Sequence, residues 1–151
     1  MKRRAKAQSV VRERPTKYGS AAVLSKQQVP IKQMIEHINK GLPYGELEHL
    51  RSEIDEPMDS LARQLSIPRS TLQRRKAERR LSSQESERMM RFWRILQHAS
   101  SVFGTVERAR QWLKFPQRGL GQAVPLEYAS TEIGAREVDD LLGRIEYTVY
   151  W

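Results

Sequence analysis

Six polar residues lie within eight positions of one another in the middle of the chain, and their side chains complement the edges of DNA bases. An arginine donates two parallel hydrogen bonds to guanine, a glutamine pairs in the same way with adenine, and serine or threonine commonly contacts phosphate. These candidate DNA-binding residues are Arg69, Ser70, Thr71, Gln73, Arg74 and Lys76. Such a set can recognise DNA only if a single helix presents it to the major groove.

The surrounding run LARQLSIPRSTLQRRK has the spacing of a helix-turn-helix. This unit needs a small residue where two helices cross, together with apolar side chains that lock the helices. Ala62 supplies the small residue. The apolar locks are Leu61, Leu65, Ile67 and Leu72. The spacing predicts a helix-turn-helix over about residues 58–80.

Two positions depart from the usual pattern of this unit. Ser66 stands where the turn usually has glycine, and Arg75 stands where an apolar residue is usual. We expect Arg75, Lys76, Arg79 and Arg80 to extend a phosphate-binding patch beyond the base-reading residues. Two other interpretations stay open: a solvated pair of basic helices, and binding to phosphate without sequence preference.

The distribution of charge also indicates a polyanionic partner. The chain has 151 residues and a net charge of +9. Residues 1–20 carry 7 basic and 1 acidic side chain, and residues 63–103 carry 10 and 3, whereas residues 104–151 carry 6 and 7. We expect the basic segments to bind nucleic acid. Residues 1–24 have few large apolar side chains and are predicted to be a disordered basic arm, either solubilising or phosphate-tracking.

Residue types typical of enzymes are sparse. The chain has no cysteine, and His37, His49 and His98 form no H-x-x-x-H pair. Nucleophile-elbow, phosphate-loop and dinucleotide motifs are absent from the sequence. We therefore predict no catalysis, metal, cofactor or small-molecule substrate. The longest uncharged stretch is 12 residues, shorter than the roughly 20 that a membrane span needs, and we expect a cytoplasmic protein without membrane contact.

The elements that must position these residues are all helices by their periodicity. Helices are expected over about 25–39, beginning near Pro30, then over 44–52, 59–65 and 69–76. Ser82 and Glu85 form a capping box that opens a long helix. The expected core residues of that helix are Met89, Phe92, Trp93, Leu96, Ala99 and Phe103.

The last third of the chain continues the helical pattern. Thr105 is expected to cap a helix that Pro116 ends, Pro125 to open a short turn of helix, and Thr131 to begin the final helix. The inward stripe of the final helix is predicted to be Ile133, Val138, Leu141, Leu142 and Ile145. Only residues 147–151 show a trace of the alternation typical of a strand.

Several features of this last third are suited to contact with another protein. Gly119 and Gly121 permit positive φ or a close approach of backbone. Arg136 and Arg144 lie eight residues apart on one helix face, where they can reach acidic groups of a partner or remain solvated. The terminal YTVYW is aromatic, so we expect a partner, a second copy or the domain core to cover it.

The same segment resembles a known family. The run W-L-x-x-P-x-x-x-L-G-x-x-x-P-L-E, followed by T-x-x-G-A-x-E-V-x-x-L-L-x-R-I-E-Y, is similar to the toxin-binding domain of the Xre-type antitoxins of bacterial RES–Xre toxin–antitoxin pairs, the MbcA/ParS/Xre group. Upstream, T-L-x-R-R-K and L-S-x-x-E-S-x-R resemble that family's helix-turn-helix half. The resemblance covers roughly residues 41–151.

This resemblance implies a protein that neutralises a cognate RES-domain toxin and represses its own operon by binding operator DNA, as a homodimer. In the family the toxin degrades NAD and the antitoxin blocks its active site, so NAD is the partner's substrate. The toxin-binding residues would be Gly119, Gly121, Arg136, Arg144, Tyr147, Tyr150 and Trp151.

We therefore expect an all-α protein with an N-terminal helix-turn-helix domain and a small helical toxin-binding domain. The expected divisions are the arm at 1–24, the helix-turn-helix domain at 25–103 and the toxin-binding domain at 104–151. Two other functions stay open: a stand-alone helix-turn-helix regulator whose C-terminal domain dimerises, and a nucleoid scaffold with weak, sequence-tolerant DNA binding.

Overall fold

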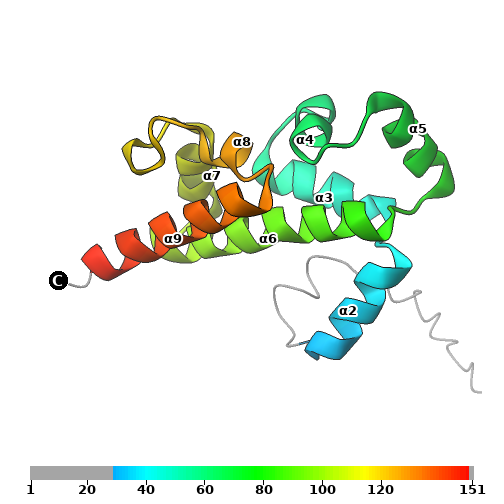
Figure 1. Cartoon of the computed structure of the whole chain (residues 1–151), viewed down its shortest axis with the longest axis horizontal. Helices are drawn as coiled ribbons and strands as arrows, with labels where there is room; N and C mark the ends of the chain where they lie inside the picture. The colour runs from blue at the N-terminus through cyan, green and yellow to red at the C-terminus, as the bar shows by residue number, and fades with distance from the viewer. Residues whose placement is uncertain (1–28, 150–151) are drawn as a thin grey trace, which may run out of the picture.

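Helices make up the regular structure of residues 29–149, the part of the chain that the computed structural model describes (Figure 1). They are α2 (Ile31–Lys40), α3 (Tyr44–Ile54), α4 (Met58–Gln64), α5 (Arg69–Glu78), α6 (Ser83–Phe103), α7 (Val106–Lys114), the short 3-10 helix η1 (Arg118–Leu120), α8 (Pro125–Tyr128) and α9 (Glu132–Val149). Residues 29–149 contain only isolated β-bridges beside these helices. The predicted all-α fold is confirmed.

Prolines set where the first four of these helices begin. Pro30, Pro43, Pro57 and Pro68 each stand directly before a helix with an extended backbone, with ψ between 134° and 151°. Because the pyrrolidine ring fixes φ and removes the amide donor, each proline ends the preceding segment and leaves the next residue free to start a helix.

The long helix α6 is the element on which the others pack. Its capping box is present: Ser82 Oγ accepts from the Glu85 amide at 3.2 Å, and Glu85 Oε2 accepts from the Ser82 amide at 2.8 Å. Five of the six predicted core residues are buried, and the sixth, Phe103, is half-buried with its ring centroid 5.5 Å from that of Trp112.

The arrangement around α6 separates the predicted DNA-binding helices from the last third of the chain. Figure 1 shows α9 running beside α6, with α7 and α8 near one half of that pair and α3, α4 and α5 near the other. Helix α2 packs on α6 from the side away from α4 and α5. The buried residues form one core cluster that extends from Leu42 to Leu142.

One prediction about the final helix is wrong. Ile133 is 77% exposed, because α9 turns Ala135, Val138 and Leu142 inward and Ile133 lies about 200° around the helix from Ala135. The weak alternation after Glu146 does not interrupt the predicted helical pattern, since α9 continues through Val149. Tyr150 and Trp151 lie outside the described residues.

No helix within residues 29–149 has the length and hydropathy that a membrane span needs.

Candidate functional site

Helices α4 and α5 form the predicted helix-turn-helix. The crossing residue Ala62 and all four apolar locks are buried, with Leu61 and Leu65 fully enclosed. The turn between the helices is closed by a hydrogen bond from the Ile67 amide to the Ala62 carbonyl at 2.8 Å. Ser66 has a φ of +55°, so the serine adopts the left-handed conformation that glycine usually supplies at this turn, at a cost of roughly 1 kcal/mol.

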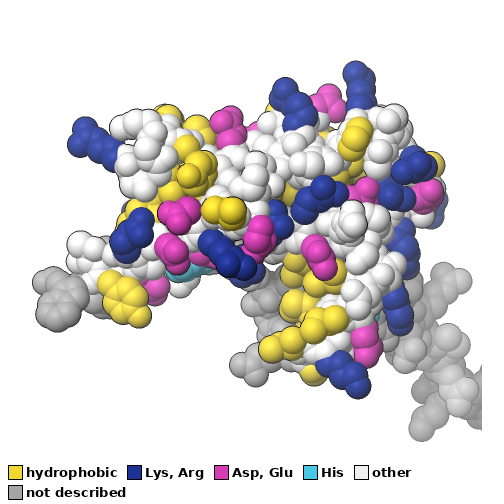
Figure 2. Space-filling view, viewed as in Figure 1, with side chains coloured by type: hydrophobic (Ala, Val, Ile, Leu, Met, Phe, Trp, Pro, Cys, Tyr) yellow, Lys and Arg dark blue, Asp and Glu magenta, His cyan; other side chains and the backbone are white. Residues whose placement is uncertain are grey.

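The six predicted DNA-binding residues share one accessible helix. They all lie on α5, where Thr71 is half-buried and the other five are exposed. Figure 2 shows Lys and Arg side chains spread around the region that α4 and α5 occupy. Helix α5 has no acidic residue in its first turn, so no carboxylate of that turn offsets the positive end of the helix dipole. This arrangement suits contact with a polyanion.

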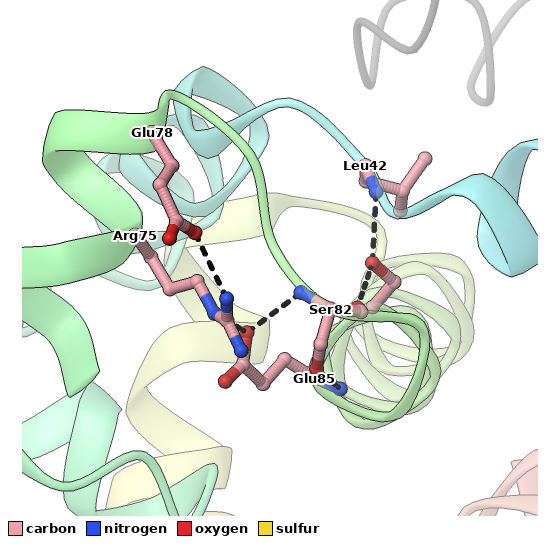
Figure 3. A network of polar contacts seen from close by, with 6 residues as sticks. Leu42, Arg75, Glu78, Ser82 and Glu85 are labelled. Atoms are coloured by element: carbon pink, nitrogen blue, oxygen red, sulfur yellow. Dashed lines mark hydrogen bonds and ion pairs between the residues drawn. The ribbon is translucent and has the colours of Figure 1, made fainter.

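Arg75 does not extend the phosphate-binding patch as predicted. Its Nε donates to Glu85 Oε2 at 2.8 Å and its Nη1 donates to Glu78 Oε2 at 2.9 Å, so the guanidinium is turned toward α6 (Figure 3). The Arg75 side chain is only 19% exposed. The charge at this usually apolar position therefore has a buried partner, and Arg75 joins α5 to α6.

The same cluster reaches the link between α2 and α3. Ser86 Oγ donates to the Ser82 carbonyl at 2.7 Å and accepts from the Leu42 amide at 2.8 Å. Burial of the Glu85 carboxyl raises its pKa, but the hydrogen bonds from the Ser82 backbone and Arg75 outweigh burial, and the net pKa of Glu85 is lowered. The same ion pairs raise the pKa of Arg75. Glu85 is thus held as a carboxylate.

Arg80 also departs from its predicted role. Its Nη1 donates to the Gly41 carbonyl at 2.8 Å and lies 3.3 Å from the Lys40 carbonyl. A Cβ at Gly41 would lie 2.0 Å from the Leu81 carbonyl oxygen, and Gly41 has a φ of +84°. Only glycine fits at position 41, where the backbone packs against the Leu81 carbonyl. The hydrogen bonds from Arg80 hold the end of α2 beside this contact.

The loop after α7 carries the first predicted toxin-binding residues. Gln117 Nε2 donates to the Trp112 and Phe115 carbonyls at 3.0 Å each, which fixes the start of the loop. Gly121 is exposed and left-handed, with a φ of +63°. A Cβ at Gly119 would lie 2.6 Å from Leu141 Cδ1, so this glycine lets η1 pack closely on α9.

Helix α9 presents the remaining predicted residues that the structure describes. Arg136 is exposed and its Nε lies 3.4 Å from Glu132 Oε1 in the same helix. Arg144 is exposed two turns further on, and Tyr147 is 74% exposed. Gly119 is thus packed against Leu141 of α9, whereas nothing lies within 4 Å of a Cβ built at Gly121, and Arg136 and Tyr147 lie toward opposite ends of α9. Tyr150 and Trp151 fall outside the described residues.

Sequence reasoning missed the contacts that hold the last third of the chain on the helix-turn-helix half. Arg110 Nε donates to the Glu53 carbonyl and Lys114 Nζ donates to the Asp55 carbonyl. Lys114 Nζ also lies 3.5 Å from Glu56 Oε1. These cations satisfy carbonyls at the C-terminal end of α3, where helices leave acceptors unpaired. The only sequence signal for these contacts was the spacing of Arg110 and Lys114, which lie four residues apart on α7.

Gly134 lies where α8 meets the start of α9. A Cβ there would lie 1.8 Å from the Tyr128 carbonyl oxygen, so α8 crosses the start of α9 in backbone contact. Thr131 Oγ1 accepts from the Gly134 amide at 3.0 Å, which confirms Thr131 as the cap of the final helix.

The histidines lie apart from one another. The His49 ring stacks on Trp93 with centroids 5.3 Å apart, and His98 lies between Asp139 at 3.2 Å and Glu146 at 3.7 Å. Among residues 29–149, no cluster of three or more potential metal ligands is found.

Two family models match this chain, and together they span most of its length. The Antitoxin Xre-like helix-turn-helix domain matches residues 33–94, and the Antitoxin Xre/MbcA/ParS C-terminal toxin-binding domain matches residues 98–147. The first range includes α4 and α5, and the second includes the loop after α7 and most of α9.

Curated relatives agree with these matches. The chain is 34% identical over 119 residues to "Antitoxin Xre" of Yersinia enterocolitica serotype O:8 / biotype 1B, covering 78% of this chain and 80% of the relative. It is 34% identical over 114 residues to "Antitoxin Xre" of Photorhabdus laumondii subsp. laumondii, covering 74% of this chain and 77% of the relative. A protein of the same name from Pseudomonas putida is 31% identical over 80 residues, covering 52% of this chain and 50% of that protein.

Proposed function

Because the chain belongs to the Xre family of antitoxins, we propose that it neutralises a RES-type toxin and represses its own operon. The observation that carries this proposal is the pairing of two exposed surfaces on one molecule. One is the polar face of α5, and the other comprises the loop after α7 and the outer face of α9. In this proposal the protein is a cytoplasmic homodimer that lies on the nucleoid when bound to its operator.

The operator-binding surface is the exposed face of α5 from Arg69 to Lys76. Arg69, Gln73 and Arg74 are exposed there and carry donors suited to guanine and adenine edges. Ser70, Thr71 and Lys76 would contact phosphates and set the register of the helix in the groove. The buried locks of α4 and α5 keep this face rigid, as recognition of bases requires.

The toxin-binding surface is built from Gly119, Gly121, Arg136 and Arg144 with the aromatic end of the chain. The toxin-binding family model covers residues 98–147 and thus includes Tyr147. Tyr147 is an exposed aromatic residue, and aromatic side chains with arginines are the usual anchors of protein interfaces. We propose that Tyr147, Tyr150 and Trp151 obstruct the active site of an NAD-degrading toxin.

One experiment separates the two activities. A strain carries the toxin gene that neighbours this gene, together with a fluorescent reporter under the operon's promoter. Arg74→Ala should abolish repression of the reporter and leave growth rescue intact, because Arg74 lies on α5 and far along the chain from the toxin-binding segment. Deletion of residues 146–151 should abolish rescue and leave repression intact.

Each variant is therefore the control for the other. Rescue by the truncated chain would show that the aromatic end is not the blocking element. If the protein represses the reporter but does not rescue growth from any neighbouring toxin, it is a stand-alone regulator. If Arg74→Ala weakens binding to operator and to scrambled DNA equally, the protein is a sequence-tolerant scaffold.

A further inference from the structure

We propose that the loop after α7 carries the anchor of the toxin interface, formed by the aromatic ring of Phe115 and the guanidinium of Arg118. The inference rests on the proposed antitoxin function, and it names two residues that the function above does not assign. The toxin surface that fits this pair is an apolar pocket for the ring beside a carboxylate for the guanidinium. The exposure, the rigidity and the charge of the loop support the assignment.

Both side chains of this pair are accessible to a partner. Phe115 is 65% exposed, and Arg118 is exposed as well. Neither side chain makes an ion pair, a side-chain hydrogen bond or an aromatic contact within residues 29–149. The two residues are three positions apart, so their Cα atoms lie within about 11 Å and one patch of a partner can contact both. Aromatic residues and arginine are the types most enriched at the centres of protein interfaces.

Hydrogen bonds and packing fix the shape of this loop without a partner. The Gln117 amide donates to the Ala123 carbonyl at 3.0 Å, and the Gln122 amide donates to the Gln117 carbonyl at 2.9 Å. Leu120 is buried at the centre of the loop. Directly before the loop, Lys114 Nζ donates to a carbonyl at the end of α3. Because the loop is already ordered, little conformational entropy is lost when a partner binds it.

Charge and position favour the toxin over a second copy or DNA. Residues 115–124 contain one basic and no acidic residue, so a two-fold contact of the loop with itself would bring two Arg118 guanidinium groups together. Figure 1 shows the loop after α7 and the DNA-binding helix α5 at opposite ends of the molecule. The loop lies within residues 98–147, which match the toxin-binding family model, and it contains Gly119 and Gly121 of the proposed toxin-binding surface.

Displacement of the wild-type chain from its toxin complex tests this assignment. The tagged wild-type chain is co-purified with the toxin encoded beside its gene, and untagged full-length variants compete for that toxin at increasing concentration. Phe115→Ser should need about thirtyfold more protein than the wild type for half displacement, the loss typical of an aromatic hot spot. Arg118→Glu should need about tenfold more, because it places an acidic side chain opposite the carboxylate of the toxin.

Tyr128→Ser and Arg108→Glu are the matched controls. Tyr128 is an aromatic residue of α8 that is 41% exposed, and Arg108 is an exposed basic residue of α7. Both lie within the family-matched range but outside the loop, so both variants should displace the wild type as efficiently as the unchanged chain. Thermal unfolding should be unchanged in all four variants, because all four side chains are exposed. Operator affinity should also be unchanged.

Three outcomes would overturn the assignment: Phe115→Ser competes as well as the wild type, Tyr128→Ser loses as much affinity as Phe115→Ser, or Arg118→Glu loses affinity for operator and keeps its affinity for toxin. The last outcome would identify the loop as a DNA contact. If the wild-type chain forms no complex with the neighbouring toxin, the proposed antitoxin function itself fails. A complex that the loop variants do not weaken leaves that function intact and removes only the role of the loop.

Discussion

At the scale of single residues, Glu85 is the carboxylate that joins α5 to the start of α6. It accepts hydrogen bonds from Arg75 of α5 and from the backbone of Ser82, while its own amide donates to Ser82 Oγ. The Glu85 side chain is only 6% exposed. Charge-assisted hydrogen bonds of this kind are among the strongest in proteins, so the contact between α5 and α6 rests on one ionised group.

Glu85→Gln should lower the free energy of unfolding by about 2 kcal/mol at neutral pH, because it removes the charged partner of Arg75. The folded pKa of Glu85 lies below its usual value of 4.5, so its ionisation stabilises the fold above pH 4.5. That stabilisation disappears as the pH falls through the lowered pKa. Urea unfolding followed by tryptophan fluorescence at several pH values should show the two proteins converging in acid.

Glu78→Gln is the matched control for this prediction. Glu78 binds the same arginine at 2.9 Å, but its side chain is 49% exposed, so its loss should cost less than about 1 kcal/mol. A loss equal to that of Glu85→Gln, or a difference from the wild type that stays constant into acid, would contradict the role given to Glu85.

Residue types at helix ends were predictable, whereas partners between helices were not. The pair Ser82 and Glu85 is three residues apart, so the capping box follows from local spacing. The contact of Glu85 with Arg75 depends on the turn between α5 and α6, which no local pattern defines. For the same reason Arg75 and Arg80 were assigned to phosphates, although both guanidinium groups bond within the chain.

At the scale of elements, the start of α9 is fixed by a glycine in backbone contact. Gly134→Ala should destabilise the protein by about 1–3 kcal/mol, since the added Cβ would lie 1.8 Å from the Tyr128 carbonyl oxygen and α8 must move. Thermal and urea unfolding would measure the loss. The expected sign is opposite to that of an ordinary glycine-to-alanine change in a helix.

Gly143→Ala tests this reasoning in the same helix. Nothing lies within 4 Å of a Cβ at Gly143, so the change should stabilise α9 by about 0.5–1 kcal/mol through helix propensity alone. If both alanine variants stabilised the protein, the contact between α8 and α9 would not constrain the fold.

The helices themselves were largely predictable, because prolines, caps and apolar spacing are local signals. The locks of the helix-turn-helix were identified in full, and all are buried. Ile133 was misassigned because its spacing fits a helical stripe, while packing against α6 selects a stripe through Ala135, Val138 and Leu142. The exposure of the apolar face of α2 could not be predicted either, since an apolar stripe predicts burial but does not identify the surface that covers it.

At the scale of the whole molecule, the basic middle of the chain offers fewer free cations than its composition implies. Residues 63–103 contain 10 basic side chains. Arg75, Arg91 and Arg94 form ion pairs, at 2.8, 3.0 and 3.3 Å, with Glu85, Glu132 and Asp139 respectively. Arg80 bonds to backbone carbonyls. DNA binding should therefore depend on a small set that includes Arg69, Arg74 and Lys76.

This difference predicts how the salt dependence of DNA binding responds to substitution. Affinity falls linearly with salt on logarithmic axes, with a slope of about 0.9 for each neutralised phosphate. Lys76→Gln should reduce that slope by about 0.9 for each bound chain, on operator and scrambled duplexes alike. Arg80→Gln removes the same formal charge but should change the slope much less, because its guanidinium is directed at Gly41. Titrations from low to physiological salt measure the slope for each variant. Equal reductions of the slope by the two variants would mean that DNA affinity depends on the summed charge of the segment and not on the exposed face of α5.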